Sequence, residues 1–145
     1  MSHVVSMELE IRDLDALKDA CKMLGLELVI GQKTFKWYGQ HVGDYPLPEG
    51  FTTHDMGKCE HAIRIPDNKS AYEIGVARRR DGQPGYVLLW DFWAGGMGMQ
   101  AKVGKDGGLM KQAYVISRSK REALKMGQKA TIIRKENGFM QLKVS

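Results

Sequence analysis

The first chemical pattern in the sequence is a row of cations in the segment 109–126. At about 100° per residue, the positions of these cations fall within an arc of roughly 80° on a helix. Leu109, Ala113 and Ile116 lie broadly on another side. The stripe predicts contacts with the phosphates of a polyanion. An ordinary solvated helix face, with Glu122 beside the same arc, is the alternative of equal weight. The four cations are Lys111, Arg118, Arg121 and Lys125.

A second group of cations is the run Arg78, Arg79 and Arg80. It belongs to a basic part of the chain, because residues 61–145 hold sixteen Lys/Arg against seven Asp/Glu, a net of +9. Residues 1–60 hold six against ten, a net of −4. We therefore expect the seven cations to form a phosphate-binding or nucleic-acid-binding surface. The alternative is that a solvated surface simply carries charge.

The sequence predicts no catalytic residues, no metal and no cofactor. His54, Asp55, Cys59 and His61 are close in sequence, but neither a Cys-x-x-Cys pair nor a His-Glu-x-x-His helix is present. Cys59 and His61 could meet on one face of a strand, but Glu60 would then point away.

The glycine-rich segment 95–108 does not match a phosphate-cradling loop, because Lys105 is followed by Asp106 instead of Ser or Thr. Free backbone N–H groups at Gly108 and Leu109 could hold an anion at a helix start. A flexible connector is the favoured interpretation. Asp91, between apolar neighbours, is either a general base or a structural hydrogen-bond acceptor paired with an arginine of the 78–80 run.

The elements that must position these residues follow from hydrophobic spacing. Alternation over 5–11 predicts a half-buried strand, and spacings of three and four over 14–24 predict a helix with Asp13 as N-cap and Gly25 at its end. Residues 26–30 and 34–38 have the composition of two strands joined by a hairpin loop. The composition of residues 39–60 predicts a long loop over the surface.

Residues 86–144 repeat this order of strand, helix and hairpin, after two further predicted strands. Strands are expected at 62–65, 72–79 and 86–92, and apolar residues at both parities make 86–92 a central strand. A helix over 109–126 precedes a hairpin of 130–134 and 139–144, turned by Asn137-Gly138. The predicted fold class is α+β. Two β-α-β-β units, at 4–38 and 86–144, form a single domain, 1–145, with an antiparallel or mixed sheet packed against two helices.

Length and composition limit the size of the domain and the compartment in which the protein is expected. The chain has 145 residues, which is enough for one core without disulfides, and it holds only two cysteines. No apolar stretch reaches the roughly 20 residues of a membrane span, and the start of the chain lacks a signal-sequence pattern. These features predict a cytoplasmic protein that does not engage a membrane.

Several short motifs resemble a known family. They are the opening Met1-Ser2-His3, the segment 11–17, Tyr72-Glu73-Ile74-Gly75, the tryptophan-rich 89–93, and Lys111-Gln112-Ala113-Tyr114 in a helix that ends at Gly127. Together they resemble the domain-of-unknown-function family numbered 1257, which includes plastid and cyanobacterial hypothetical reading-frame 35 proteins and many bacteriophage proteins. The resemblance implies an α+β domain without an established activity. The end of the chain, Lys143-Val144-Ser145, departs from the basic and tryptophan-containing end of that family.

These observations predict a non-enzymatic binding protein, of phage type, that engages nucleic acid or another polyanion through its basic C-terminal half. One alternative is a protein-interaction adaptor that acts on a host protein. The other is a nucleotide or small-molecule binder. An exposed apolar patch or open strand edge would favour the adaptor, and a closed polar pocket would favour the small-molecule binder.

Overall fold

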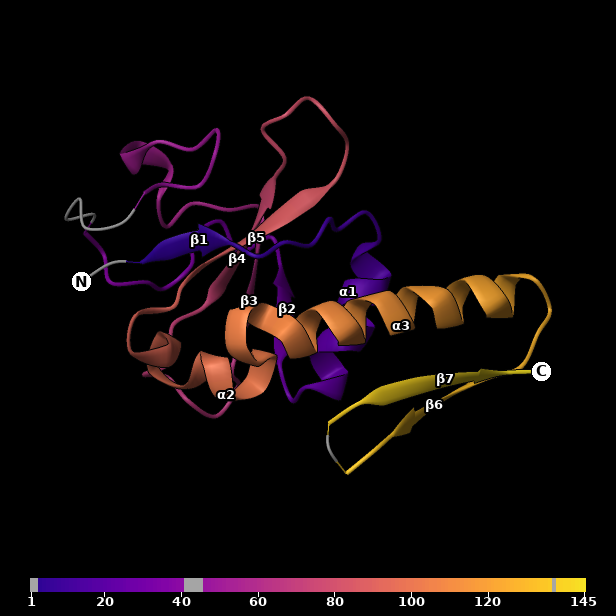
Figure 1. Ribbon diagram of the computed structural model, residues 1–145. Coiled ribbons are helices and arrows are strands. Elements are labelled where there is room, and N and C mark those ends of the chain that lie inside the picture. Colours follow the sequence, from indigo (N-terminus) through magenta and orange to yellow (C-terminus); the bar gives the residue numbers. More distant parts are fainter. Residues whose placement is uncertain (1–2, 41–45, 137) are drawn as a thin grey trace.

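The computed structural model describes residues 3–40, 46–136 and 138–145. Its main feature is a five-stranded antiparallel sheet, in which β5 and β4 join strands from distant parts of the chain (Figure 1). This sheet and the helices on it confirm the α+β class. In spatial order the strands are β1 (Val4–Ser6), β5 (Tyr86–Asp91), β4 (Ile74–Arg78), β3 (His61–Arg64) and β2 (Glu27–Ile30).

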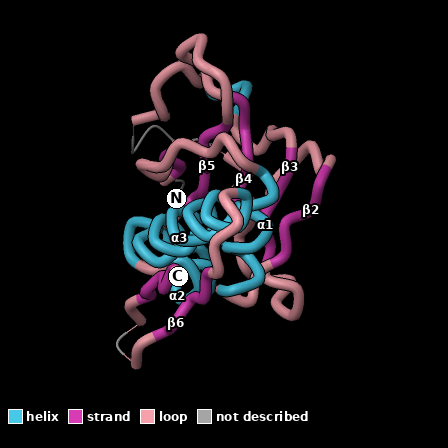
Figure 2. The backbone as a smooth tube through the Cα atoms, turned by 90° about the vertical axis from the view of Figure 1, so that its right-hand side faces the viewer, coloured by secondary structure: helices cyan, strands magenta, loops and turns pink. Residues whose placement is uncertain are grey.

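Within the described residues, three α-helices lie to one side of this sheet. Figure 2 shows this arrangement. The helices are α1 (Leu14–Met23), α2 (Met99–Val103) and α3 (Gly108–Lys125). The start of α1 is as expected, because the Asp13 carboxylate accepts a hydrogen bond from the backbone N–H of Ala16 at 3.0 Å. Gly25 follows the helix with a φ of +71°, a left-handed conformation that glycine adopts without a steric cost.

The two faces of the sheet pack against different parts of the chain. On β5, Leu88 and Trp90 belong to the core beneath the helices, whereas Leu89 packs with the opposite core. That opposite core is covered by residues of the segments 35–40 and 46–59, chiefly by Phe35, Phe51 and other apolar side chains. Strand β5 therefore has both faces buried, which confirms it as an interior strand.

The segment 34–38 is not the strand that its composition predicts. Strand β2 pairs with β3 instead, and Thr34 makes only an isolated bridge to Lys58. The reason is the small side chains on the second face of the sheet, where Gly75 leaves room for the Phe35 ring. A Cβ atom at Gly75 would lie 2.3 Å from Phe35 Cδ1. The chain therefore leaves the sheet edge and crosses the face, so the first β-α-β-β unit is not formed.

The first strand is also shorter than the predicted 5–11. Strand β1 ends at Ser6, and the N–H of Leu9 donates to the carbonyl of Met7 at 2.7 Å in a tight turn. The chain returns to β5 at Ile11, which exchanges hydrogen bonds with Tyr86 at 3.0 and 2.7 Å. The apolar alternation is preserved in part, since Met7 and Ile11 are both buried.

The end of the chain forms its own two-stranded antiparallel sheet from β6 (Ala130–Arg134) and β7 (Met140–Val144). This hairpin packs against α3 and is separate from the large sheet (Figures 1 and 2). The order of strand, helix and hairpin expected for 86–144 is confirmed. Of the predicted turn, Gly138 has a φ of +85° and Asn137 lies outside the described residues.

Among the described residues, none of the helices combines the length and apolar character that crossing a bilayer requires.

Candidate functional site

The structure gathers cations in a hollow of about 600 Å³ between the start of α1 and one side of α3. Arg118, Arg121 and Lys125 reach it from α3, and Arg12 reaches it from the segment before α1. Three of the four stripe residues are therefore brought together, with a cation from the opposite end of the chain. The remaining lining residues are Asp13, Leu14, Asp15, Tyr86 and Glu122.

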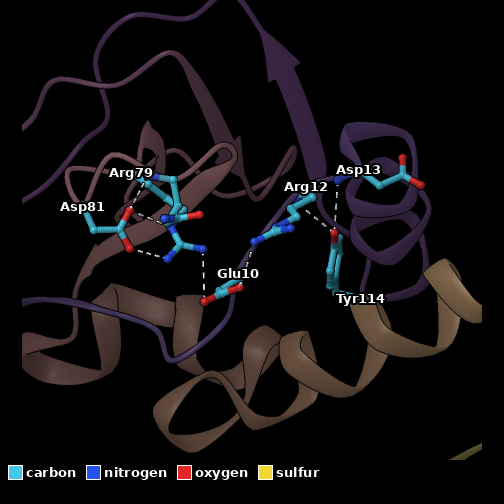
Figure 3. A network of polar contacts seen from close by, with 7 residues as sticks. Glu10, Arg12, Asp13, Arg79, Asp81 and Tyr114 are labelled. Atoms are coloured by element: carbon cyan, nitrogen blue, oxygen red, sulfur yellow. Dashed lines mark hydrogen bonds and ion pairs between the residues drawn. The ribbon is translucent and has the colours of Figure 1, made fainter.

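Tyr114 fixes the position of Arg12 at this hollow. Its side chain is buried on α3, and its hydroxyl oxygen accepts hydrogen bonds from the backbone N–H groups of Arg12 at 3.0 Å and Asp13 at 3.1 Å (Figure 3). These two donors precede the first turn of α1, so one phenol joins the two helices at the site. The Arg12 guanidinium remains half-exposed, with Nη2 3.8 Å from a carboxylate oxygen of Glu10.

The four cations differ in how strongly they are already engaged. Arg121 donates to Asp19 on α1 at 2.7 Å, and this hydrogen bond raises the pKa of Arg121. Arg118 lies 3.7 Å from Glu122, one turn further along α3. Lys125 makes no ion pair within the described part of the chain. Arg12, Arg118 and Lys125 are thus the side chains that can turn toward an anion, while Arg121 holds the helices together.

Tyr86 adds an aromatic surface to the same hollow, and Arg78 extends the cluster. The Arg78 guanidinium carbon lies 5.5 Å from the centroid of the Tyr86 ring, in cation–π contact. An aromatic ring among guanidinium groups is a surface on which a nucleic-acid base can stack. The hollow is not uniformly positive, since its lining holds four cations and the three carboxylates of Asp13, Asp15 and Glu122, a net of +1.

Arg79 and Arg80 lie elsewhere, in a hollow of about 710 Å³ with an acidic lining. The Arg79 side chain is only 10% exposed and is held by Asp81, through a Nε contact of 3.1 Å and a shorter Nη2 contact, and by Glu10 at 3.0 Å (Figure 3). Arg80 lies 4.6 Å from the centroid of the Phe51 ring and 3.5 Å from Asp55. Both arginines therefore have structural contacts that a phosphate would have to displace.

Lys111, the fourth member of the stripe, is separated from the other three. It lines a hollow of about 380 Å³ near Trp90, Phe92 and Asp106. It lies almost two turns of α3 before Arg118, beyond the reach of the first hollow.

The candidate nucleophile and metal residues are engaged in local contacts. The Cys59 thiol donates to the carbonyl of Gln32 at 3.3 Å, and burial raises its pKa to about 11, so it is a neutral thiol near pH 7. His61 accepts from the N–H of Gly31 at 2.9 Å, and His54 lies 3.0 Å from Lys58 Nζ. The described residues contain no group of three or more His, Cys, Asp and Glu side chains suited to a metal ion.

Asp91 is fully buried at the end of β5, where its carboxylate accepts three backbone hydrogen bonds. The donors are the N–H groups of His3 at 3.0 Å, Tyr38 at 3.1 Å and Trp93 at 3.0 Å. Two distant segments thus meet the end of β5 at one carboxylate, which is the structural hydrogen-bond acceptor role that the sequence offers as one of two interpretations. The expected arginine partner from the 78–80 run is not among its contacts.

The glycine-rich connection consists of tight turns and a short helix. Residues 94–97 form a left-handed turn in which Ala94 and Met97 have φ values of 51° and 56°. Helix α2 follows, and α3 then begins directly at Gly108. Left-handed backbone costs a non-glycine residue about 1–2 kcal/mol, so surrounding contacts must impose it. One such contact is the hydrogen bond from Tyr72 N–H to the Gly96 carbonyl at 2.9 Å.

Helical spacing was sufficient to group Arg118, Arg121 and Lys125. Helical spacing does not indicate Arg12 and Tyr86, which come to the hollow from other elements, or Tyr114, which holds the Arg12 backbone from the buried side of α3. Tyr114 carried one usable signal, because it lies on the apolar side of α3 with Met110 and Ser117 and so had to place a phenol inside the protein.

No protein-family model, curated protein or solved structure matches this chain.

Proposed function

We propose that this protein is a non-enzymatic binding protein for nucleic acid, and that the hollow between α1 and α3 is its phosphate-binding site. The observation that carries the proposal is that Arg12, from the segment before α1, meets Arg118 and Lys125 of α3 beside Tyr86. Guanidinium and ammonium groups around an aromatic ring suit a phosphate next to a base. Arg78, in contact with Tyr86, provides a further cation at the margin.

The proposal has a quantitative consequence for the dependence of affinity on salt. Each phosphate contact adds about 0.9 to the magnitude of the slope of log affinity against log salt for duplex DNA. Replacing Arg12 and Lys125 by alanine is therefore expected to reduce that magnitude by about 1.8. Binding should weaken equally for all sequences, since phosphate contacts carry no direct sequence information. Fluorescence anisotropy with duplex and single-stranded oligonucleotides across a salt series measures this.

The matched control replaces Arg80 and Lys111, which line two other hollows, by alanine. This control removes the same formal charge, so it separates a localised site from general surface charge. The slope should change much less than in the Arg12 and Lys125 double variant. Equal changes in both variants, or no binding at low salt, would reject the proposed site.

The phage-type origin implied by the family resemblance and a cytoplasmic setting are parts of the same proposal. A reducing compartment is consistent with the two buried free thiols, Cys21 and Cys59. A protein-interaction adaptor is the second candidate, and one observation favours it: the C-terminal hairpin has an unpaired strand edge at β6 and exposed apolar side chains, among them Ile133. A nucleotide or small-molecule binder would use the same hollow between α1 and α3.

A further inference from the structure

The sheet formed by β6 and β7 has two strands and therefore two edges. Isolated two-stranded sheets are marginally stable, and this one is supported on one face by α3. Its other face carries Ile133, which is 40% exposed. Natural edge strands are commonly protected by proline, by a bulge or by charged side chains. Strand β6 contains neither proline nor a bulge and pairs with β7 without interruption, and its cations are Arg134 and the flanking Lys129 and Lys135.

The ladder shows which backbone groups face outward. Lys129 and Ser145 exchange both hydrogen bonds, at 3.0 and 2.9 Å, and Lys135 N–H donates to Phe139 at 2.7 Å. Antiparallel pairs alternate between bonded and non-bonded, so the N–H and C=O groups of Ala130, Ile132 and Arg134 point away from β7.

The two edges differ in whether the rest of the protein uses them. On β7, the outward N–H of Met140 already donates to the Gln112 side chain of α3 at 2.8 Å. On β6, the described part of the chain offers no hydrogen-bond partner to the outward backbone groups. The outward backbone groups of β6 are therefore unpaired within the described residues, whereas the Arg134 side chain donates to the Met23 carbonyl at the end of α1 at 2.6 Å.

A hollow of about 330 Å³ lies beside β6, between that strand and the helices α1 and α3. Its apolar lining comes from Met23, Leu124 and Ile132, one residue from each of the three elements. A strand added to β6 would alternate its side chains, placing every second one on the side of this hollow. Apolar side chains at alternate positions would fit that side.

The positive charge around the β6 edge favours acidic side chains at those positions of an added strand that do not face the hollow. The hairpin and the residue before it carry Lys129, Arg134, Lys135 and Lys143, against the single carboxylate of Glu136 among the described residues. A second copy of β6 is disfavoured, because an antiparallel pair centred on Ile132 would place Lys129 opposite Lys135 of the other copy. Like charges directly opposite each other destabilise a sheet.

We propose that the β6 edge binds an extended acidic segment of another protein by strand addition, with alternate apolar side chains directed to the hollow beside Ile132. Backbone hydrogen bonds would supply affinity, and the hollow and the lysines would supply selectivity. This inference is independent of the proposed nucleic-acid site, since the two surfaces share only Arg121.

The test uses the full chain and a fluorescent peptide of alternating valine and glutamate. We expect saturable binding by anisotropy, with a peptide of alternating valine and lysine bound at least roughly tenfold more weakly. Amide hydrogen exchange by NMR provides the specific readout. In the complex, the amides of Ala130, Ile132 and Arg134 should become protected, whereas those of Thr131 and Ile133 are already protected in the free protein.

The discriminating variant is Ala130→Pro, which removes an outward N–H and fills the edge with a ring but breaks no bond to β7. Binding of the acidic peptide should fall by roughly tenfold or more. Far-UV circular dichroism and the melting temperature show whether the hairpin remains folded. Lys105→Glu, a charge reversal outside the hairpin, should leave the affinity unchanged, whereas Lys129→Glu should lower it.

Several results would overturn the proposal. They are an unchanged affinity in folded Ala130→Pro, no added protection at the three outward amides, or equal binding of polyglutamate, which has no apolar side chains. Displacement of the peptide by a single-stranded oligonucleotide, with Ala130→Pro leaving both affinities intact, would instead assign the hairpin to nucleic acid. Self-association of the free chain through β6 would assign it to a second copy.

Discussion

At the scale of single residues, the Tyr114 hydroxyl is predicted to stabilise the fold as well as the site. Tyr114→Phe removes the acceptor of the Arg12 and Asp13 N–H groups while preserving the buried ring. Two partly buried donors would then lack their partner, so we expect a loss of about 1–3 kcal/mol in the free energy of unfolding. Urea denaturation followed by circular dichroism measures it.

Tyr38→Phe is the matched control, because the Tyr38 side chain is 43% exposed. A surface change of this kind should remain within about 0.5 kcal/mol of the parent. If Tyr114→Phe were equally neutral, the connection between α1 and α3 would have to rest on other contacts, chiefly the Asp19–Arg121 pair at 2.7 Å.

At the scale of elements, the crossing of the sheet face by the segment 34–38 depends on Gly75. Gly75→Ala places a methyl group where the Phe35 ring lies, so we expect destabilisation of about 1–3 kcal/mol by overpacking. Phe35→Ala alone should cost about 3–5 kcal/mol, because it empties a buried site. The double variant should cost less than the sum, since removing the ring relieves the clash. Urea denaturation of all three variants provides the double-mutant cycle.

Gly108→Ala is the control for the added methyl group. Apart from its chain neighbours and the backbone of α3, no atom of the described residues lies within 4 Å of a Cβ built there, and the residue has helical dihedral angles at the start of α3. It should be neutral or stabilising by up to about 1 kcal/mol. Strict additivity of Gly75→Ala and Phe35→Ala would show that the ring does not occupy the space above Gly75.

The difference between α1 and the segment 34–38 shows which elements local sequence can specify. Helix α1 follows from its own apolar spacing, with Asp13 and Gly25 at its two ends. Residues 34–38 have strand-like composition, but their hydrogen bonds depend on distant groups, such as the Gly57 carbonyl that accepts from Phe35 at 2.9 Å. An extended segment takes its partner from tertiary structure, and a single sequence does not identify that partner.

The candidate site also combines residues that local sequence groups together with residues that only tertiary packing brings near. The cations of α3 share one helix face, so their spacing placed Arg118, Arg121 and Lys125 together. The sequence does not show that Arg121 pairs with Asp19, because Asp19 lies on another helix. Arg12 joins them only because the turn after β1 returns the chain to β5 at Ile11, a consequence of packing that no local pattern encodes.

At the scale of the whole molecule, the acidic and basic parts of the sequence are interleaved in space. The sheet order places β1 beside β5 and β3 between β2 and β4, so residues from both parts line every major hollow. The hollow around Arg79 and Arg80 contains four carboxylates, a net of −2, while the hollow with Arg12 has a net of +1. The folded protein therefore presents hollows of opposite charge, and Glu10 contacts a cation of each, Arg79 at 3.0 Å and Arg12 at 3.8 Å (Figure 3).

Folding also shifts the pKa values of several groups, and these shifts determine how stability depends on pH. Burial is the first cause that lowers the pKa of His61 below its ordinary 6.5. The pKa values of Asp55 and Asp81 are lowered below 3.8, first by hydrogen bonds from the Thr52 backbone and the Arg79 side chain respectively. In the opposite direction, burial raises the pKa of Cys59 from 9.0 to about 11 and that of Cys21 to about 12.

We predict that the urea midpoint is highest between pH 6.5 and 9.0, the ordinary pKa values of histidine and cysteine. A group whose pKa is lower in the folded than in the unfolded protein binds more protons in the unfolded chain, so stability falls as the pH decreases. His61 causes such a fall below pH 6.5. Asp55 and Asp81 cause a second fall below pH 3.8. The two thiols have a higher pKa in the folded than in the unfolded protein, so their contribution to stability is lost as the pH rises above 9.0. His61→Gln should remove the step near 6.5 and leave the other acid step intact. A parent midpoint that stays constant through that window would contradict the assignment to His61.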